Sequence, residues 1–84
     1  MTLHWIRHHK LEDWLRQHHK LLATGDAILL TNTAISQLPP EAPCAQPLHA
    51  LSDEVIQPLP AYVNLIDDAQ WLNLVLKYDH QITW

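Results

Sequence analysis

Hydrophobic positions change their spacing along the chain, and the first spacing is that of an amphipathic helix. The residues that recur at helical intervals are Leu11, Trp14, Leu15, His18 and Leu22. They predict a helix over about residues 10–23. Gly25 follows where a helix ends, because glycine adopts the left-handed backbone conformation that closes many helices.

Short apolar runs predict strands elsewhere in the chain. The run Ala27–Leu30 is apolar at every position, as in strands of parallel sheets that are covered on both faces. The last run alternates, with Ile82 and Trp84 on one face, and predicts a half-buried strand. The five predicted strands cover residues 2–6, 27–30, 48–51, 61–66 and 80–84.

The segments between these strands carry helix and loop signals. Residues 31–38 fit either a short helix or an irregular crossing. Residues 39–47 hold four prolines, which exclude a helix interior and predict a loop. Ser52 is a suitable N-cap for a short helix, which the prolines after it would stop. Asp67 or Asp68 is a suitable cap for the next helix.

The order of these elements predicts the fold class. Strands that alternate with helices form a mostly parallel sheet with helices on both faces. We therefore expect a single small three-layer α/β domain over residues 1–84, with a sheet of four or five strands flanked by helices.

The helix expected over residues 68–78 is apolar nearly all round, and one small domain cannot cover every side of it. Its apolar residues are Trp71, Leu72, Leu74, Val75, Leu76 and Tyr78. We expect part of this set to be buried against another subunit, and we take Trp71, Leu74, Tyr78 and Trp84 as the interface residues. Simple half-exposure of an aromatic ring is the alternative.

Composition excludes several classes of function. The single Gly among 84 residues excludes the dinucleotide and Walker A phosphate loops, which need several glycines. A single Cys excludes an internal disulfide and a cysteine-rich zinc site. Five basic against nine acidic residues disfavour direct nucleic-acid binding. Apolar runs of at most four residues predict no membrane span and no signal peptide.

Two histidine pairs are candidate metal ligands. They are His8 with His9 and His18 with His19. Adjacent histidines diverge on a helix, whereas two ligands on one helical face need a spacing of four residues. Solvated histidines at the helix rim are therefore the favoured interpretation, and we expect no metal or other cofactor.

Cys44 is the candidate nucleophile, and its functional interpretation is a persulfide carrier. It lies in the proline-rich loop with no Lys, Arg or His within four residues, so nothing local lowers the pKa of its thiol. An incidental exposed thiol is the favoured interpretation, and we expect no active site within this chain alone.

Four segments together resemble the TusB/DsrH family of sulfur-relay proteins. The family places a Gly-Asp strand after its first helix, an Ala-Leu-x-x-Asp stretch before its middle helix, and a strand ending in tryptophan at the close. The matching segments here are Leu3-His4, Gly25–Leu30, Ala50–Val55, in which Glu54 stands at the position of the family's Asp, and Lys77–Trp84.

The resemblance implies a small α/β subunit of the DsrE/F/H type. Such a subunit assembles with TusC-like and TusD-like subunits into a heterohexamer in the cytoplasm. The complex takes sulfur from a TusA-like carrier and passes it to a TusE-like one, for 2-thiolation of the wobble uridine of tRNA. The transferring cysteine is on the TusD-like subunit, which implies a non-catalytic role for this chain. DsrH proteins of sulfur oxidisers carry a cysteine near the first helix, and its absence before Cys44 favours tRNA modification over sulfur oxidation.

Overall fold

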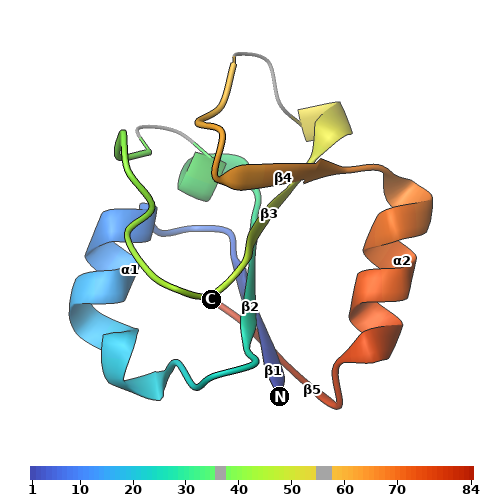
Figure 1. Ribbon diagram of the computed structural model, residues 1–84, viewed down its shortest axis with the longest axis horizontal. Coiled ribbons are helices and arrows are strands. Elements are labelled where there is room, and N and C mark those ends of the chain that lie inside the picture. The colour runs from blue at the N-terminus through green and yellow to red at the C-terminus, as the bar shows by residue number, and fades with distance from the viewer. Residues whose placement is uncertain (36–37, 55–57) are drawn as a thin grey trace.

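The computed structural model describes residues 1–35, 38–54 and 58–84 (Figure 1). Its five strands form one parallel sheet in the order β4-β3-β2-β1-β5. The strands are β1 Thr2–Ile6, β2 Ala27–Leu30, β3 Leu48–Leu51, β4 Val63–Ile66 and β5 His80–Thr83. The predicted α/β class and parallel sheet are confirmed.

One α-helix covers each face of the sheet, so the molecule has three layers (Figure 1). The helices are α1 Leu11–His18 and α2 Asp68–Lys77. Single 3₁₀ turns lie at His19–Leu21, Asn32–Ile35 and Ser52–Glu54. Within the described residues, neither helix has the length and apolar character needed to cross a bilayer.

Strand β2 is the centre of the sheet and is buried at every position, as its uninterrupted apolar run predicts. Side chains on alternate residues of a strand point to opposite faces, so Ile28 and Leu30 join the core under α1 while Ala27 and Leu29 join the core under α2. Leu38, Cys44 and Leu59 from the long connections also pack on the α1 side.

The first helix is shorter than its periodicity predicts. It ends at His18 and continues as a 3₁₀ turn, so the expected span of residues 10–23 is only partly helical. Gly25 has the expected positive φ, at 95°, but it does not cap the helix, because α1 ends at His18 and the 3₁₀ turn after it ends at Leu21. Residues 31–38 hold a 3₁₀ turn at Asn32–Ile35, whereas residues 36–37 lie outside the described part of the chain.

The second helix begins at the expected place through a capping box. The Asp67 carboxylate accepts from Gln70 N at 2.8 Å, and the Gln70 side-chain oxygen accepts from Asp67 N at 2.9 Å. Asp67, and not Asp68, is therefore the N-cap. The strand before it begins at Val63, two residues later than expected, because a turn from Pro60 to Val63 occupies the start of that segment.

The last strand is more exposed than its alternating pattern predicts. All four residues of β5 are exposed, and Ile82 is 42% exposed, so the expectation of a half-buried strand is wrong for β5 itself. The strand joins the outer side of β1, at the edge of the sheet, where neither helix covers Ile82. Only Trp84, just beyond the strand, packs against the core under α1.

Candidate functional site

The expected interface residues of α2 mostly face this chain's own sheet. Tyr78, just after α2, is 8% exposed and belongs to the core with Leu3 and Leu29, so it offers little surface to a partner. Trp71 and Leu74 are half-buried against the same core. The sequence pattern therefore overestimated the apolar surface of α2 that this chain leaves uncovered. Periodicity does not show how much of a helix the sheet covers.

The exposed apolar side chains of α2 are Leu72 and Leu76, at 52% and 74% exposure. They lie one helical turn apart, so they are neighbours on the helix surface. Helical periodicity places Asn73 and Lys77 about 100° around the helix from the two leucines. The β5 strand adjoins α2 through a hydrogen bond from Gln81 Nε2 to Val75 O at 3.1 Å.

We call Leu72, Leu76 and the strand β5 the β5-side surface. Among the described residues, β5 pairs only with β1, so its outer backbone edge has no strand partner. Unpaired strand edges readily add another strand. The sequence pattern included both leucines among the apolar residues of the helix but gave no reason to choose them over the residues that turned out to face the sheet.

Cys44 is half-buried and not the exposed thiol that the sequence suggested. It packs against the core under α1, and its thiol donates to Gln46 O at 3.8 Å. Burial raises the pKa of the Cys44 thiol, which the contact with Gln46 only partly offsets. Since the thiolate is the nucleophile, this environment is the opposite of the one that activates a sulfur-carrying cysteine.

The two histidine pairs do not converge. His8 and His9 are exposed between β1 and α1, whereas His19 uses its ring nitrogen Nδ1 on Leu15 O at 3.2 Å. His18 packs against Trp84 in a tilted arrangement, with ring centroids 4.4 Å apart and the ring planes at 35°. Within the described ranges, His, Cys, Asp and Glu side chains form no group of three or more that would hold a metal ion.

A buried polar network joins β1, the start of β2 and the last residue of the sequence. Asp26 is 3% exposed and accepts from Thr2 N at 2.8 Å, Ala23 N at 3.1 Å and the His4 ring at 3.2 Å. Burial by itself would raise the pKa of Asp26, but these hydrogen bonds outweigh burial and hold the pKa below its ordinary value of 3.8.

His4 is held on both ring nitrogens. Nε2 faces the Asp26 carboxylate, and Nδ1 accepts from the Trp84 indole N–H at 3.4 Å. Asp26 only accepts and the Trp84 indole N–H only donates, so this hydrogen-bond pattern assigns the donor role to Nε2 and the acceptor role to Nδ1. His4 is 2% exposed and packs against the Trp14 ring at 5.4 Å. Both ring nitrogens are engaged and the pair is buried, so the His4–Asp26 contact links β1 to the start of β2.

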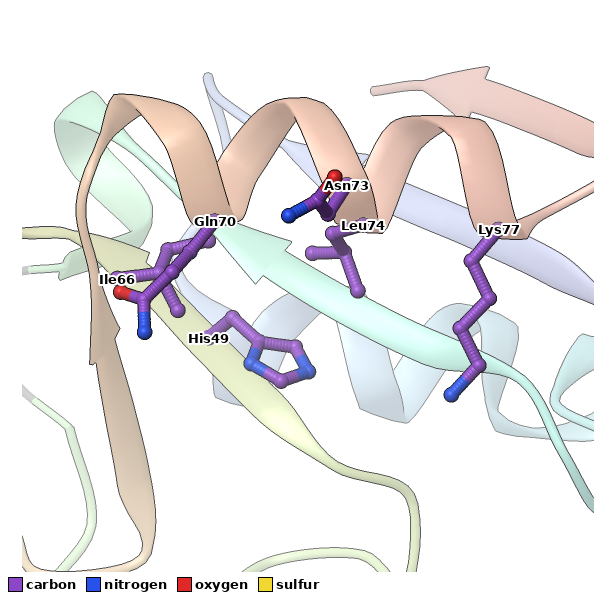
Figure 2. Close-up of a pocket in the computed structure, with 6 residues that line it drawn as sticks. All are labelled: His49, Ile66, Gln70, Asn73, Leu74 and Lys77. Atoms are coloured by element: carbon purple, nitrogen blue, oxygen red, sulfur yellow. The ribbon is translucent and has the colours of Figure 1, made fainter.

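The other flank of α2 borders a shallow cavity of about 290 Å³ over β3 and β4. Figure 2 shows the His49 ring below the helix, with one nitrogen toward Gln70 and the other toward Lys77. The lining residues are His49, Ile66, Gln70, Asn73, Leu74 and Lys77. A single histidine in a short strand and polar residues spread along a helix give no spacing motif, so the sequence alone did not point to this cavity.

His49 sits in this cavity as a neutral side chain. Burial, and then the positive charge of Lys77, lower the pKa of His49 from its ordinary value of 6.5. Its Nδ1 is buried and has no hydrogen-bond partner. The lining contains no carboxylate, so the one formal charge in the cavity is the ammonium group of Lys77.

Comparisons with known proteins give no family for this chain. A scan against protein-family models found no match, and a search of curated proteins found no similar protein.

Proposed function

We propose that this chain is a non-catalytic, structural subunit of a cytoplasmic sulfur-relay complex of the TusB/DsrH type. Its partners in this proposal are TusC-like and TusD-like subunits, and the assembly is a heterohexamer. A TusA-like carrier supplies sulfur and a TusE-like carrier receives it, for 2-thiolation of wobble uridine in tRNA. The chain uses no cofactor and makes no direct contact with nucleic acid or membrane.

The observation that carries the proposal is the β5-side surface. Leu72 and Leu76 are more than half exposed on α2, and β5, which α2 contacts through the Gln81–Val75 hydrogen bond, has a free edge within the described residues. Proteins normally cover unpaired strand edges and exposed apolar patches. A partner subunit that packs on this surface would bury both leucines and pair the edge of β5.

The positions of the resembling segments give further support. Three of the four segments that resemble the TusB/DsrH family meet in the buried network of His4, Asp26 and Trp84. Residues that lie far apart in the sequence therefore serve one structural purpose, as expected of a motif set that specifies a fold. The network holds β5 against β1 and so fixes the edge that we propose as an interface.

The environment of Cys44 argues against the alternative in which this chain carries the sulfur itself. A persulfide carrier needs an accessible thiol with a low pKa, whereas burial raises the pKa of Cys44. In the proposed complex the sulfur-carrying cysteine belongs to the TusD-like subunit. The contribution of this chain is to complete the assembly around that cysteine.

The test is co-expression of this chain with TusC-like and TusD-like chains encoded in the same genome, followed by native mass spectrometry. We expect a complex that contains all three chains. The variant Leu72→Ser/Leu76→Ser should lose the complex while it keeps the far-UV circular dichroism and thermal midpoint of the wild type.

Leu21→Ser is the matched control, because Leu21 is 55% exposed on the 3₁₀ turn after α1, away from the β5-side surface. It should leave the complex intact. A wild-type chain that stays monomeric with both partners present would contradict the proposal. Full assembly of the double variant would exclude the β5-side surface as the interface.

A further inference from the structure

The cavity between α2 and the strands β3 and β4 has no role in the proposed assembly, since neither Leu72 nor Leu76 lines it. Its volume of about 290 Å³ is near the lower end of the range for small-molecule sites. Such a volume suits a compact ligand the size of a single substituted ring.

The floor and the helix wall of the cavity are apolar. Ile66 comes from the end of β4, and Leu74 comes from the middle of α2. Ile66 is 8% exposed and anchored in the core under α2, so it forms a fixed surface. These two side chains would contact the apolar body of a ligand, as in most small-molecule sites.

The polar groups of the cavity are mostly hydrogen-bond donors. Gln70 uses its side-chain oxygen in the capping box, which leaves its NH₂ group as the part free to bind a ligand. Lys77 carries the ammonium group, and no carboxylate lies within salt-bridge distance of it in the described chain. This set favours an acceptor-rich, negatively charged ligand.

The imidazole ring of His49 adds a further hydrogen-bonding group to the cavity. The buried Nδ1 has no acceptor in reach, so a proton there would be unsatisfied. Nδ1 lacks a donor as well as an acceptor, so Nε2 is the ring nitrogen that can bind a ligand, and we assign the proton to it. Figure 2 shows one ring nitrogen on the Lys77 side of His49 and the other on the Gln70 side. The donors Nε2–H and Lys77 Nζ thus lie at the same end of the cavity.

We propose that this cavity binds a small organic monoanion, a carboxylate on a compact apolar body. The carboxylate lies between Lys77 Nζ and the His49 ring, and the apolar body lies against Ile66 and Leu74. Asn73 and the Gln70 amide border the cavity and provide further hydrogen bonds. Charge complementarity favours this class, because the lining has one cation and no anion.

The probe is benzoate, titrated into the full ¹⁵N-labelled chain and followed by NMR. We expect saturable shifts confined to β3, the end of β4 and the cavity flank of α2. Benzamide, the neutral isostere, and acetate, which lacks the apolar body, should each bind at least about fivefold more weakly. Equal affinity for benzoate and benzamide would overturn the proposal, as would shifts spread over the whole surface or no binding.

Lys77→Gln should weaken benzoate binding by about fivefold, which corresponds to about 1 kcal/mol. Lys20→Gln removes another exposed lysine, from the turn after α1, and should leave benzoate affinity unchanged. If both variants bind as the wild type does, the proposed carboxylate position is wrong. The comparison of benzoate with benzamide on the wild-type chain tests the proposal even if the Lys77 variant is unstable.

Discussion

The His4–Asp26–Trp84 network predicts a large loss of stability for Asp26→Asn. The substitution keeps the shape of the side chain but replaces one of its two acceptor oxygens by an NH₂ group. In the native chain one oxygen accepts from Thr2 N, and the other accepts from Ala23 N and the His4 ring. An asparagine in either orientation therefore turns its NH₂ group toward at least one donor.

The magnitude follows from these contacts. One buried donor without a partner costs about 1–3 kcal/mol, and the hydrogen bonds that remain lose the strengthening given by the carboxylate charge. We expect a decrease of about 3 kcal/mol in the free energy of unfolding. For a chain of 84 residues this corresponds to a fall of roughly 15–20 °C in the thermal midpoint.

Urea unfolding followed by circular dichroism at neutral pH measures this loss. Asp79→Asn is the control, because Asp79 is exposed between α2 and β5 and should change stability by less than about 0.5 kcal/mol. An Asp26→Asn variant as stable as the Asp79 control would refute the reasoning that the buried carboxylate holds these segments together.

The pH dependence provides a second check of the same reasoning. The folded pKa of Asp26 lies below 3.8, because its hydrogen bonds outweigh the effect of burial. A depressed carboxylate pKa stabilises the folded state above the unfolded pKa, and this contribution is lost as the pH falls through the folded pKa. The stability gap between the wild type and Asp26→Asn should therefore narrow below about pH 3.8. A gap that stays constant with pH would contradict the assignment of an ionised Asp26.

Three further outcomes follow from single side chains. The lowered pKa of His49, due to burial and then to Lys77, means that the unfolded state binds a proton more readily. Wild-type stability should therefore fall as the pH drops below 6.5, and His49→Gln should reduce this fall in urea titrations at pH about 7.5 and about 5.5. Tyr62→Phe removes the hydrogen bond from the phenol to Pro39 O and should lower the free energy of unfolding by about 1 kcal/mol in the same assay. Cys44 should react with iodoacetamide more slowly than free cysteine at neutral pH, and Cys44→Ser should leave sulfur transfer by the assembled complex unchanged; loss of transfer would revive the sulfur-carrier alternative.

Local signals in the sequence determined the elements of this fold. Four apolar residues in a row are sufficient to predict β2 as a covered strand of a parallel sheet. Asp67 or Asp68 predicted the start of α2, and the structure shows that Asp67 is the cap, through a capping box between residues three apart. Gly25 marks a positive φ for the same local reason. Each of these signals depends on residues that are close together in the sequence, so it can be recognised without knowledge of the fold.

Tertiary structure alone decided which surfaces are covered. The pattern of α2 could not separate Tyr78, which is buried, from Leu76, which is exposed, because both are apolar and only the position of the sheet distinguishes them. Likewise β5 reads as a half-buried strand but lies exposed at the sheet edge beside β1. Burial depends on what lies opposite a residue, and periodicity carries no information about that.

The two polar arrangements of this protein also arise only in the folded chain. His4 and Trp84 are 80 residues apart in sequence, and they meet because β5 pairs with β1. His49 and Lys77 share a cavity because α2 crosses the face that β3 presents. The sequence supplied donors and acceptors with no motif spacing, and the strand order brought them together.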